Sequence, residues 1–268
     1  MRVLHIWNPA GVASTLAKYQ VRILGWSAWV ITRRSADRFG LTTYGELLDC
    51  GSLRFLTLAV LRARRFDVIH VHMLDKLVPA LKAIYPRKKV VLHYHGSDIR
   101  GRWCERRRFW KAADLILVST PDLLEGAPAD ACVRYLPNPV DTDLFKPIPS
   151  LRRPGTALFI TSSEAKHRAS EKWAVRMAER LGLKLHIIDR DKEAIPHRRL
   201  PLVLNAYEYF IDHRWVPALS KTALEALACG LKVVRWDGKV IQGLPERHRP
   251  GAVVRALASL YEQLRGLG

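Results

Sequence analysis

Short apolar runs alternate along the chain with longer segments whose hydrophobic positions have helical spacing. In the first part of the chain, the apolar runs predict strands at residues 2–7, 28–32, 67–72, 90–95, 114–119 and 133–136. Helices are predicted between them at 13–24, 53–64, 76–85 and 103–112. Strands that are apolar throughout and alternate with helices are typical of a parallel sheet covered on both faces.

Residues 145–155 interrupt this alternation with three prolines and a glycine, and we interpret them as a linker. Beyond the linker the alternation resumes. Strands are predicted at 157–161, 184–188, 209–212 and 231–234, and helices at 169–181, 201–206, 220–229 and 250–267. The pattern therefore predicts an α/β fold of two Rossmann-like, doubly wound parallel-sheet domains, residues 1–150 and 151–268, that face a cleft.

The segment at 220–230 is the most informative part of the sequence. Ser220 is a favourable N-cap, Gly230 is a helix stop, and a buried strand follows directly. The first amides of a helix lack intrahelical partners at the positive end of its dipole, so the turn at Lys221 and Thr222 suits an anion. Glu225 lies about one and a half turns further in, near the anion site, and would suit the ribose hydroxyls of a nucleotide. The alternative is an ordinary amphipathic helix with a solvated Glu225.

Other candidate side chains lie where the predicted strands end. Gly11 follows the first strand, where it either lets the backbone approach a ligand or simply makes a turn. His93 and His95 share one strand face, and His70 and His72 share a face one strand earlier. These histidines have no evident carboxylate partner, so we expect no metal site. His95 is either a core histidine or a site residue.

The remaining metal and disulfide signals are weak. Asp141 and Asp143 form an Asp-x-Asp pattern inside a turn-rich connector, where such side chains organise turns. The scattered cysteines have no ligand spacing and are expected to be buried thiols: Cys50, Cys104, Cys132 and Cys229. The sequence therefore predicts no metal centre and no disulfide framework.

The charge balance narrows the class of partner. The chain has 44 Lys and Arg against 25 Asp and Glu, a net charge of +19 over 268 residues, which favours polyanions such as nucleotides, acidic lipids or nucleic acid. The basic clusters at 62–65, 86–89 and 106–108 are either solvated faces or a patch for an anionic membrane surface or nucleic acid. Nucleic acid is not favoured, because no known nucleic-acid-binding motif is present. Without a membrane-spanning run or signal-peptide pattern, we expect a cytoplasmic chain, with a peripheral membrane contact as an option.

Three motifs occur in an order that resembles a known family. They are His-Gly-Ser-Asp at 95–98, Pro-Asn-Pro-Val-Asp at 137–141 with Phe145, and Glu-Ala-Leu-Ala-Cys-Gly at 225–230 before Val233 and Val234. Together they resemble the GT-B-fold glycosyltransferases of family 4. The resemblance implies a nucleotide-diphosphate sugar as donor substrate, held mainly by the C-terminal domain, with an unknown acceptor on the N-terminal side. It also implies metal-independent transfer with retention, and no cofactor.

The resemblance assigns roles to individual residues. Glu225 matches the ribose-binding Glu, Ser220 to Thr222 the helix start that meets the phosphates, His95 the His that faces the donor sugar, and Gly11 the glycine loop near the transferred group. Two basic residues that usually neutralise the diphosphate correspond here to Ser163 and Arg168, and Lys166 or Lys172 would substitute. Pro217 replaces a second Glu. These departures keep two alternatives open, a non-catalytic nucleotide-sugar-binding protein and a sugar-nucleotide epimerase.

Overall fold

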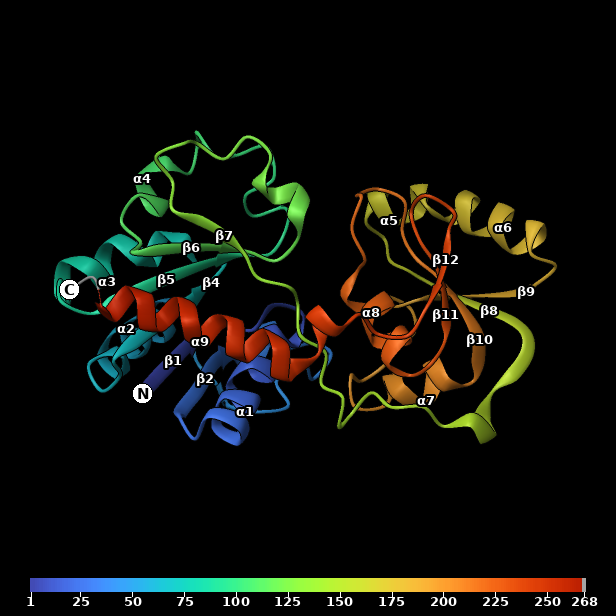
Figure 1. Cartoon of the computed structure of the whole chain (residues 1–268), viewed down its shortest axis with the longest axis horizontal. Helices are drawn as coiled ribbons and strands as arrows, with labels where there is room; N and C mark the ends of the chain where they lie inside the picture. The colour runs from blue at the N-terminus through green and yellow to red at the C-terminus, as the bar shows by residue number, and fades with distance from the viewer. Residues whose placement is uncertain (267–268) are drawn as a thin grey trace. The chain divides into compact units, whose positions relative to one another are not determined.

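The computed structural model describes residues 1–266 except the side chain of Lys166, and the chain divides into two compact units (Figure 1). The first unit contains Met1–Pro139 and the segment that begins at Pro250, and the second is Val140–Arg249. This division corrects the expected one at residues 150 and 151. Val140 and Phe145 pack in the core of the second unit, so the proline-rich segment belongs to that unit and does not link the two.

The first unit is built on a parallel sheet with the strand order β3-β2-β1-β4-β5-β6-β7 among the described residues. Its strands are β1 Arg2–Ile6, β2 Ser27–Arg33, β3 Glu46–Leu48, β4 Val68–His72, β5 Lys89–Tyr94, β6 Leu115–Val118 and β7 Val133–Tyr135. Its α-helices are α1 Val12–Leu24, α2 Ser52–Ala63, α3 Val78–Ile84, α4 Arg107–Trp110 and α9 Pro250–Gly266. Short 3-10 turns lie at Pro9–Gly11, Arg34–Ala36, Asp75–Leu77 and Pro121–Leu124.

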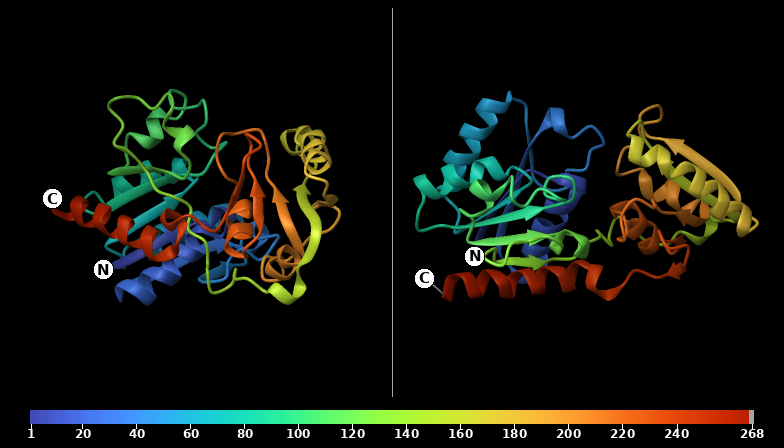
Figure 2. Two further views of the ribbon diagram at one scale, coloured as in Figure 1. Left: turned by 45° about the vertical axis from the view of Figure 1, so that its right-hand side comes forward. Right: turned by 90° about the horizontal axis from the view of Figure 1, so that it is seen from above.

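Helices cover both faces of this sheet, as the apolar strands require (Figure 2). Alternate strand residues pack with α2 and α3 on one face and with α1 and α9 on the other. The terminal helix α9 was expected in the second domain. Its apolar stripe, which includes Val254, Leu257 and Tyr261, instead completes the core on the α1 face of the first unit. Periodicity predicted this helix but could not identify the sheet that it covers.

The second unit contains a smaller sheet with the strand order β12-β11-β10-β8-β9. Its strands are β8 Arg153–Thr161, β9 Lys184–Asp189, β10 Tyr207–Ile211, β11 Lys232–Val234 and β12 Val240–Gln242. Its α-helices are α5 Ala165–Ala169, α6 Glu171–Arg180, α7 Leu200–Asn205 and α8 Lys221–Ala228, and 3-10 turns lie at Pro149–Leu151 and Glu246–His248. The pairing is parallel except at β12, which runs antiparallel to β11. The sequence pattern did not predict this edge strand. The predicted α/β fold with Rossmann-like parallel sheets is confirmed.

Candidate functional site

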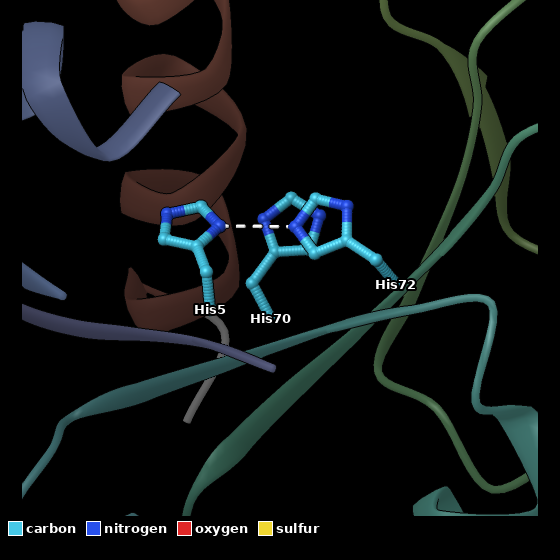
Figure 3. A group of neighbouring side chains, drawn as sticks. All are labelled: His5, His70 and His72. Carbon is cyan, nitrogen blue, oxygen red and sulfur yellow. Dashed lines mark hydrogen bonds between the residues drawn. The ribbon is translucent and has the colours of Figure 1, made fainter. Parts of the chain in front are cut away.

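Five histidines lie on one face of the first sheet, toward the carboxyl ends of the adjacent central strands β1, β4 and β5. Strand alternation places His70 and His72 on the same face, and it does the same for His93 and His95. His5 pairs in register with His70, which brings a histidine from β1 into the group. Figure 3 shows His5 beside His70 and His72. The first four rings are fully buried, whereas His95, which follows the last residue of β5, is half-buried.

Two hydrogen-bonded rows connect these rings. In the first row, Nε2 of His5 lies 2.8 Å from Oε1 of Gln20 on α1, and Nδ1 of His5 lies 3.1 Å from Nε2 of His72 (dashed in Figure 3). Nδ1 of His72 then lies 3.0 Å from Nε2 of His95. The first row therefore runs from the α1 side of the sheet to the half-buried ring of His95.

The second row begins on α9. The hydroxyl of Tyr261 hydrogen-bonds Nδ1 of His70, and Nε2 of His70 lies 3.3 Å from Nδ1 of His93. Rings of one strand also contact each other across the two rows, stacked at His70 and His72 and tilted by 32° at His93 and His95. The ring centroids of His70 and His72 are 4.2 Å apart, with an angle of 9° between the ring planes. The array is thus held by hydrogen bonds between strands and by stacking along them.

The histidines are uncharged at neutral pH. Burial lowers the pKa of His5 to about 4 and that of His95 to about 3. Burial also holds the pKa of His70, His72 and His93 well below the ordinary histidine value, and the neighbouring imidazoles lower it further. A neutral imidazole has one N–H donor and one lone pair, which suits the observed rows.

Two sets of ring nitrogens lie close enough together to be considered as metal ligands. They are His5 with His70 and His72, and His72 with His93 and His95. However, His70 and His72 stack face to face in the first set, and the facing nitrogens of His72 and His95 in the second set already share a hydrogen bond. Lone pairs of stacked rings run side by side, whereas a tetrahedral centre needs lone pairs that converge on one point. We therefore interpret the cluster as a hydrogen-bonded imidazole array.

Unusual backbone geometry marks the same edge of the first sheet. Gly11 is buried at the N-terminus of α1, in the loop after β1, and has φ of 72°. Non-glycine residues also adopt positive φ next to it and after β4: Trp7 at 77°, Ala10 at 50° and Met73 at 61°. Such conformations cost free energy and concentrate at ligand-binding loops. Gly11 and His95 therefore lie at one sheet edge, as predicted, although their contact with a ligand stays a prediction.

The second unit places the start of α8 at the carboxyl end of β10. The Ser220 hydroxyl accepts from the amide of Ala223 at 3.1 Å, which confirms the predicted N-cap. Buried Asp212 accepts from the Ser220 amide at 2.9 Å and holds the loop in place. The amides of Lys221 and Thr222 find no hydrogen-bond partner within the described part of the chain. This helix start can therefore receive an anion.

Glu225 is buried beside that helix start, with only 2% of its surface exposed, so the expected alternative of a solvated Glu225 is wrong. Its Oε1 lies 3.1 Å from Nζ of Lys221 and 3.0 Å from Nε2 of His197. Burial by itself would raise the pKa of Glu225, but the Lys221 charge and the His197 hydrogen bond keep that pKa below the ordinary value. Glu225 is therefore an ionised carboxylate with two nitrogen donors already beside it.

Sequence reasoning missed His197, Asp212 and Arg190. Arg190 directly follows β9, and burial lowers the pKa of its guanidinium against the opposing effect of the nearby Glu225 carboxylate. A basic residue directly after a strand was the available signal for Arg190. His197 lies in an irregular segment between β9 and α7, and no local pattern connects it with Glu225.

The predicted phosphate-binding residues of the α5 region are less well defined. Arg168 is exposed on α5, and the Lys166 side chain lies outside the described residues. Ser163, at the position expected for Arg, donates through both its amide and its hydroxyl to Oδ2 of Asp191, at 2.7 and 2.6 Å. The residue that joins α5 to α6 contacts the loop before α8, since the amide of Arg214 donates to Oγ of Ser170.

A cavity of about 660 Å³ opens on the first unit. It is lined by apolar side chains of α2 and by the segment after β4, with Lys76 and Arg106 in its wall. Oδ1 of buried Asp75 lies 3.4 Å from Nη1 of Arg106, so Lys76 supplies the remaining positive charge. Cavities of this size that are lined mainly by apolar groups commonly bind small molecules.

Known proteins resemble this chain in sequence and in structure. The family model described as Glycosyltransferase Family 4 matches residues 11–144, and no curated protein matches the sequence. A glycosyltransferase involved in avilamycin A biosynthesis is similar in structure, with 14% identity, a TM-score of 0.63 and coverage of 100% of this chain and 98% of that one. A sucrose-phosphate synthase from Thermosynechococcus elongatus gives 15% identity, a TM-score of 0.57 and coverage of 99% and 91%. An alpha-glucosyltransferase, solved in complex with UDP and a 13-mer DNA that contains a mismatch, has 12% identity and a TM-score of 0.57. The match covers 100% of this chain and 90% of that one.

Proposed function

The chain belongs to Glycosyltransferase Family 4, and from this membership we propose that it moves a sugar from a nucleotide-diphosphate sugar to an acceptor. We propose further that the anomeric configuration is retained and that no metal is needed. The proposal of a nucleotide-diphosphate sugar as donor is supported most directly by the geometry at the start of α8. There, two amides without described partners and the Lys221 ammonium lie beside the buried carboxylate of Glu225.

The donor diphosphate would bind at the amides of Lys221 and Thr222, with Glu225 accepting from the ribose hydroxyls. As the glycosidic bond breaks, the leaving diphosphate gains negative charge while the sugar becomes oxocarbenium-like. Fixed N–H dipoles stabilise such charge, and losing one donor typically costs about 2.7–4 kcal/mol in activation free energy. Arg168 and Lys166 remain proposed phosphate partners, and Arg190 joins them because it follows β9 near Glu225.

The sugar would meet the first unit at Gly11 and His95. The Asp98 carboxylate at this edge is already engaged by the backbone amides of His95 and Gly96. We therefore propose a front-face route in which a departing phosphate oxygen takes the proton of the acceptor hydroxyl. His95 is uncharged at neutral pH and would serve as a hydrogen-bonding group toward the sugar. It would not act as an acid.

The acceptor would occupy the 660 Å³ cavity with an apolar portion. Leu56 and Leu61 of α2 line this cavity and are 37% and 62% exposed, and the basic cluster at 62–65 continues the same helix end. This combination supports a peripheral contact with an anionic membrane surface. Among the described residues, no helix has the length and hydrophobicity to cross a membrane.

Two variants at one position test the donor site. Lys221→Ala removes the ammonium, and Lys221→Pro removes the ammonium together with the first amide N–H. Proline is tolerated at the first position of a helix, and the extended Ser220 before it is compatible with proline. We expect Lys221→Pro to bind UDP, GDP or ADP roughly 10- to 100-fold more weakly than Lys221→Ala, since hydrogen bonds to charged groups contribute about 1.5–3 kcal/mol.

Calorimetric titration of each nucleotide measures this difference, and equal affinities of the two variants would remove the helix start from the donor site. Transfer itself is tested by incubating UDP-, GDP- and ADP-sugars with an acceptor panel and detecting products by mass spectrometry. The engagement of Ser163 with Asp191 favours one further candidate, a nucleotide-sugar-binding protein without transfer. Donor binding with no product across the panel would support that candidate. A change of the sugar without any acceptor would indicate an epimerase.

A further inference from the structure

The first hydrogen-bonded row of histidines has a fixed direction. Its inner end is Oε1 of Gln20, a carbonyl oxygen that only accepts hydrogen bonds. His5 must therefore carry its proton on Nε2, which leaves Nδ1 as an acceptor. Nδ1 of His5 faces Nε2 of His72, so His72 is protonated on Nε2 as well. Because each neutral ring has one N–H, the first assignment determines the next.

The same logic extends to the outer end of the row. Nδ1 of His72 is a lone pair and faces Nε2 of His95, so His95 carries its proton on Nε2. Nδ1 of His95 is then left with a lone pair and has no hydrogen-bond partner among residues 1–266. His95 is also the half-buried ring of the array. The row therefore ends in a hydrogen-bond acceptor at the carboxyl edge of the sheet.

We propose that Gln20, His5 and His72 are positioning residues for the proposed transfer, because they hold His95 in the neutral Nε2–H tautomer and leave its Nδ1 lone pair for a hydroxyl of the donor sugar. This inference rests on the proposed function for its substrate, although the tautomer itself does not. A neutral acceptor suits the oxocarbenium-like sugar, because an imidazolium there would repel the developing positive charge. Hydrogen bonds in a row also polarise one another, which increases the electron density at Nδ1 of His95.

Other groups around His95 reinforce this arrangement. Both carboxylate oxygens of Asp98 accept from the backbone amide of His95, at 3.1 and 2.9 Å, and fix the main chain where the ring is attached. The titratable groups packed nearby are Asp98 and the other histidines of the array, with Tyr261 at the inner end of the second row. The two rows meet at their inner ends, where Tyr261 also hydrogen-bonds Gln20. Tyr261→Phe leaves the Gln20 Oε1 acceptor of His5 in place, so this variant offers a matched control.

The tautomer is measured on the whole protein by long-range ¹H–¹⁵N correlation after labelling with ¹⁵N-histidine, and the His95 signals are assigned by their loss in His95→Asn. We expect wild-type His95 to be protonated on Nε2. Gln20→Leu removes the terminal acceptor while it keeps the side-chain size, so His95 should shift to a mixture of tautomers. Tyr261→Phe removes one hydroxyl from the second row and should leave the His95 signals unchanged.

Transfer kinetics provide the second readout. Gln20→Leu should lower kcat about 2- to 10-fold with little change in KM, in line with the loss of one hydrogen bond of about 0.5–1.5 kcal/mol. Tyr261→Phe should lower kcat less. A wild-type His95 protonated on Nδ1, or His95 signals that are unaffected by Gln20→Leu, would overturn the proposal even if Gln20→Leu folds poorly, because the first test needs no variant of the row. A correct tautomer without any transfer product would refute the proposed function and leave the tautomer assignment intact.

Discussion

The buried carboxylate of Glu225 permits a sharp test of the second unit, because Glu225→Gln preserves its shape and removes its charge. Oε1 of Glu225 is approached by Lys221 at 3.1 Å and by His197 at 3.0 Å, and the Lys221 side chain is only 11% exposed. Removing one partner of a buried ion pair typically costs about 3–5 kcal/mol, because the remaining charge stays desolvated. For a unit of this size, a loss of about 3 kcal/mol corresponds to a Tm lower by roughly 10 °C or more.

Differential scanning calorimetry measures this shift, and the same unit supplies a matched control. Glu208 forms a partly exposed pair with Lys232 at 3.0 Å, so Glu208→Gln should cost at most about 1 kcal/mol. The pKa of Glu225 is lowered, so its stabilising effect is present above the ordinary Glu pKa and is lost as the pH falls through the folded-state value. Equal Tm shifts for Glu225→Gln and Glu208→Gln would refute the reasoning.

The same pair of variants separates stability from nucleotide binding. At a temperature well below unfolding, Glu225→Gln should weaken UDP binding by roughly 10- to 100-fold if the carboxylate accepts from ribose hydroxyls. Glu208→Gln should bind UDP as the wild type does. A large Tm shift with unchanged UDP affinity would make Glu225 a structural residue and remove it from the donor site.

Three further changes test other parts of the structure. Burial raises the pKa of Asp212 to about 6, so the folded state binds this proton more tightly than the unfolded state does. The free energy of unfolding of the wild type should therefore fall as the pH rises from about 4 to about 6. Urea unfolding of Asp212→Asn should lack that fall. Gly45→Ala should cost more than about 2 kcal/mol, because its Cβ would lie 2.7 Å from the Val30 carbonyl oxygen, whereas Gly40→Ala meets no atom within 4 Å and should cost about 1–2 kcal/mol in chemical denaturation. His95→Ala should lower turnover at least about 10-fold, because the donor sugar loses a positioning contact, and should change Tm little; a collapse of Tm instead would indicate a core role.

Most of the regular elements follow from local pattern. Buried parallel strands and amphipathic helices produce strong apolar runs and helical spacing, which explains the agreement at β1, β4 and α1. Short or irregular elements do not produce such patterns. The helix predicted at 103–112 is wrong over most of its length, because only Arg107–Trp110 is helical and Trp103 packs against the same core from a turn. The strand Glu46–Leu48 has only three residues and was not predicted.

The division of the chain shows what local pattern cannot supply. Prolines mark irregular backbone, but irregular backbone can also lie against a domain. The amide of Ile148 donates to Oδ1 of Asn205 at 2.7 Å, which attaches the expected linker to α7. Likewise, the apolar stripe of α9 does not specify its sheet. Its place in the first unit depends on complementarity with α1 and on the hydrogen bond from Tyr261 to His70.

In the candidate sites as well, local pattern predicted some residues, whereas contacts between distant segments could not be predicted. Ser220, Lys221 and Glu225 lie within two turns of one helix, so helix rules placed them correctly relative to one another. His197 meets Glu225 from 28 positions away, and Gln20 meets His5 from another element. Alternation predicted which face His70, His72, His93 and His95 share. Their hydrogen bonds depend on the order and register of β1, β4 and β5, which no local pattern encodes.

The net charge of +19, considered alone, favours nucleic acid as readily as a nucleotide. The positions of the charges in the structure distinguish the two ligands. Exposed basic clusters bind polyanions by releasing counterions, so binding that depends on them falls steeply with salt. A diphosphate at the start of α8 would depend on fixed amides and on partly buried Lys221, which salt screens much less. UDP affinity should therefore change only a few-fold between 50 and 200 mM salt, whereas RNA retention should fall by orders of magnitude. Calorimetry and filter binding at matched ionic strengths make the comparison, and RNA binding that persists at 200 mM salt would contradict this view of the surface charge.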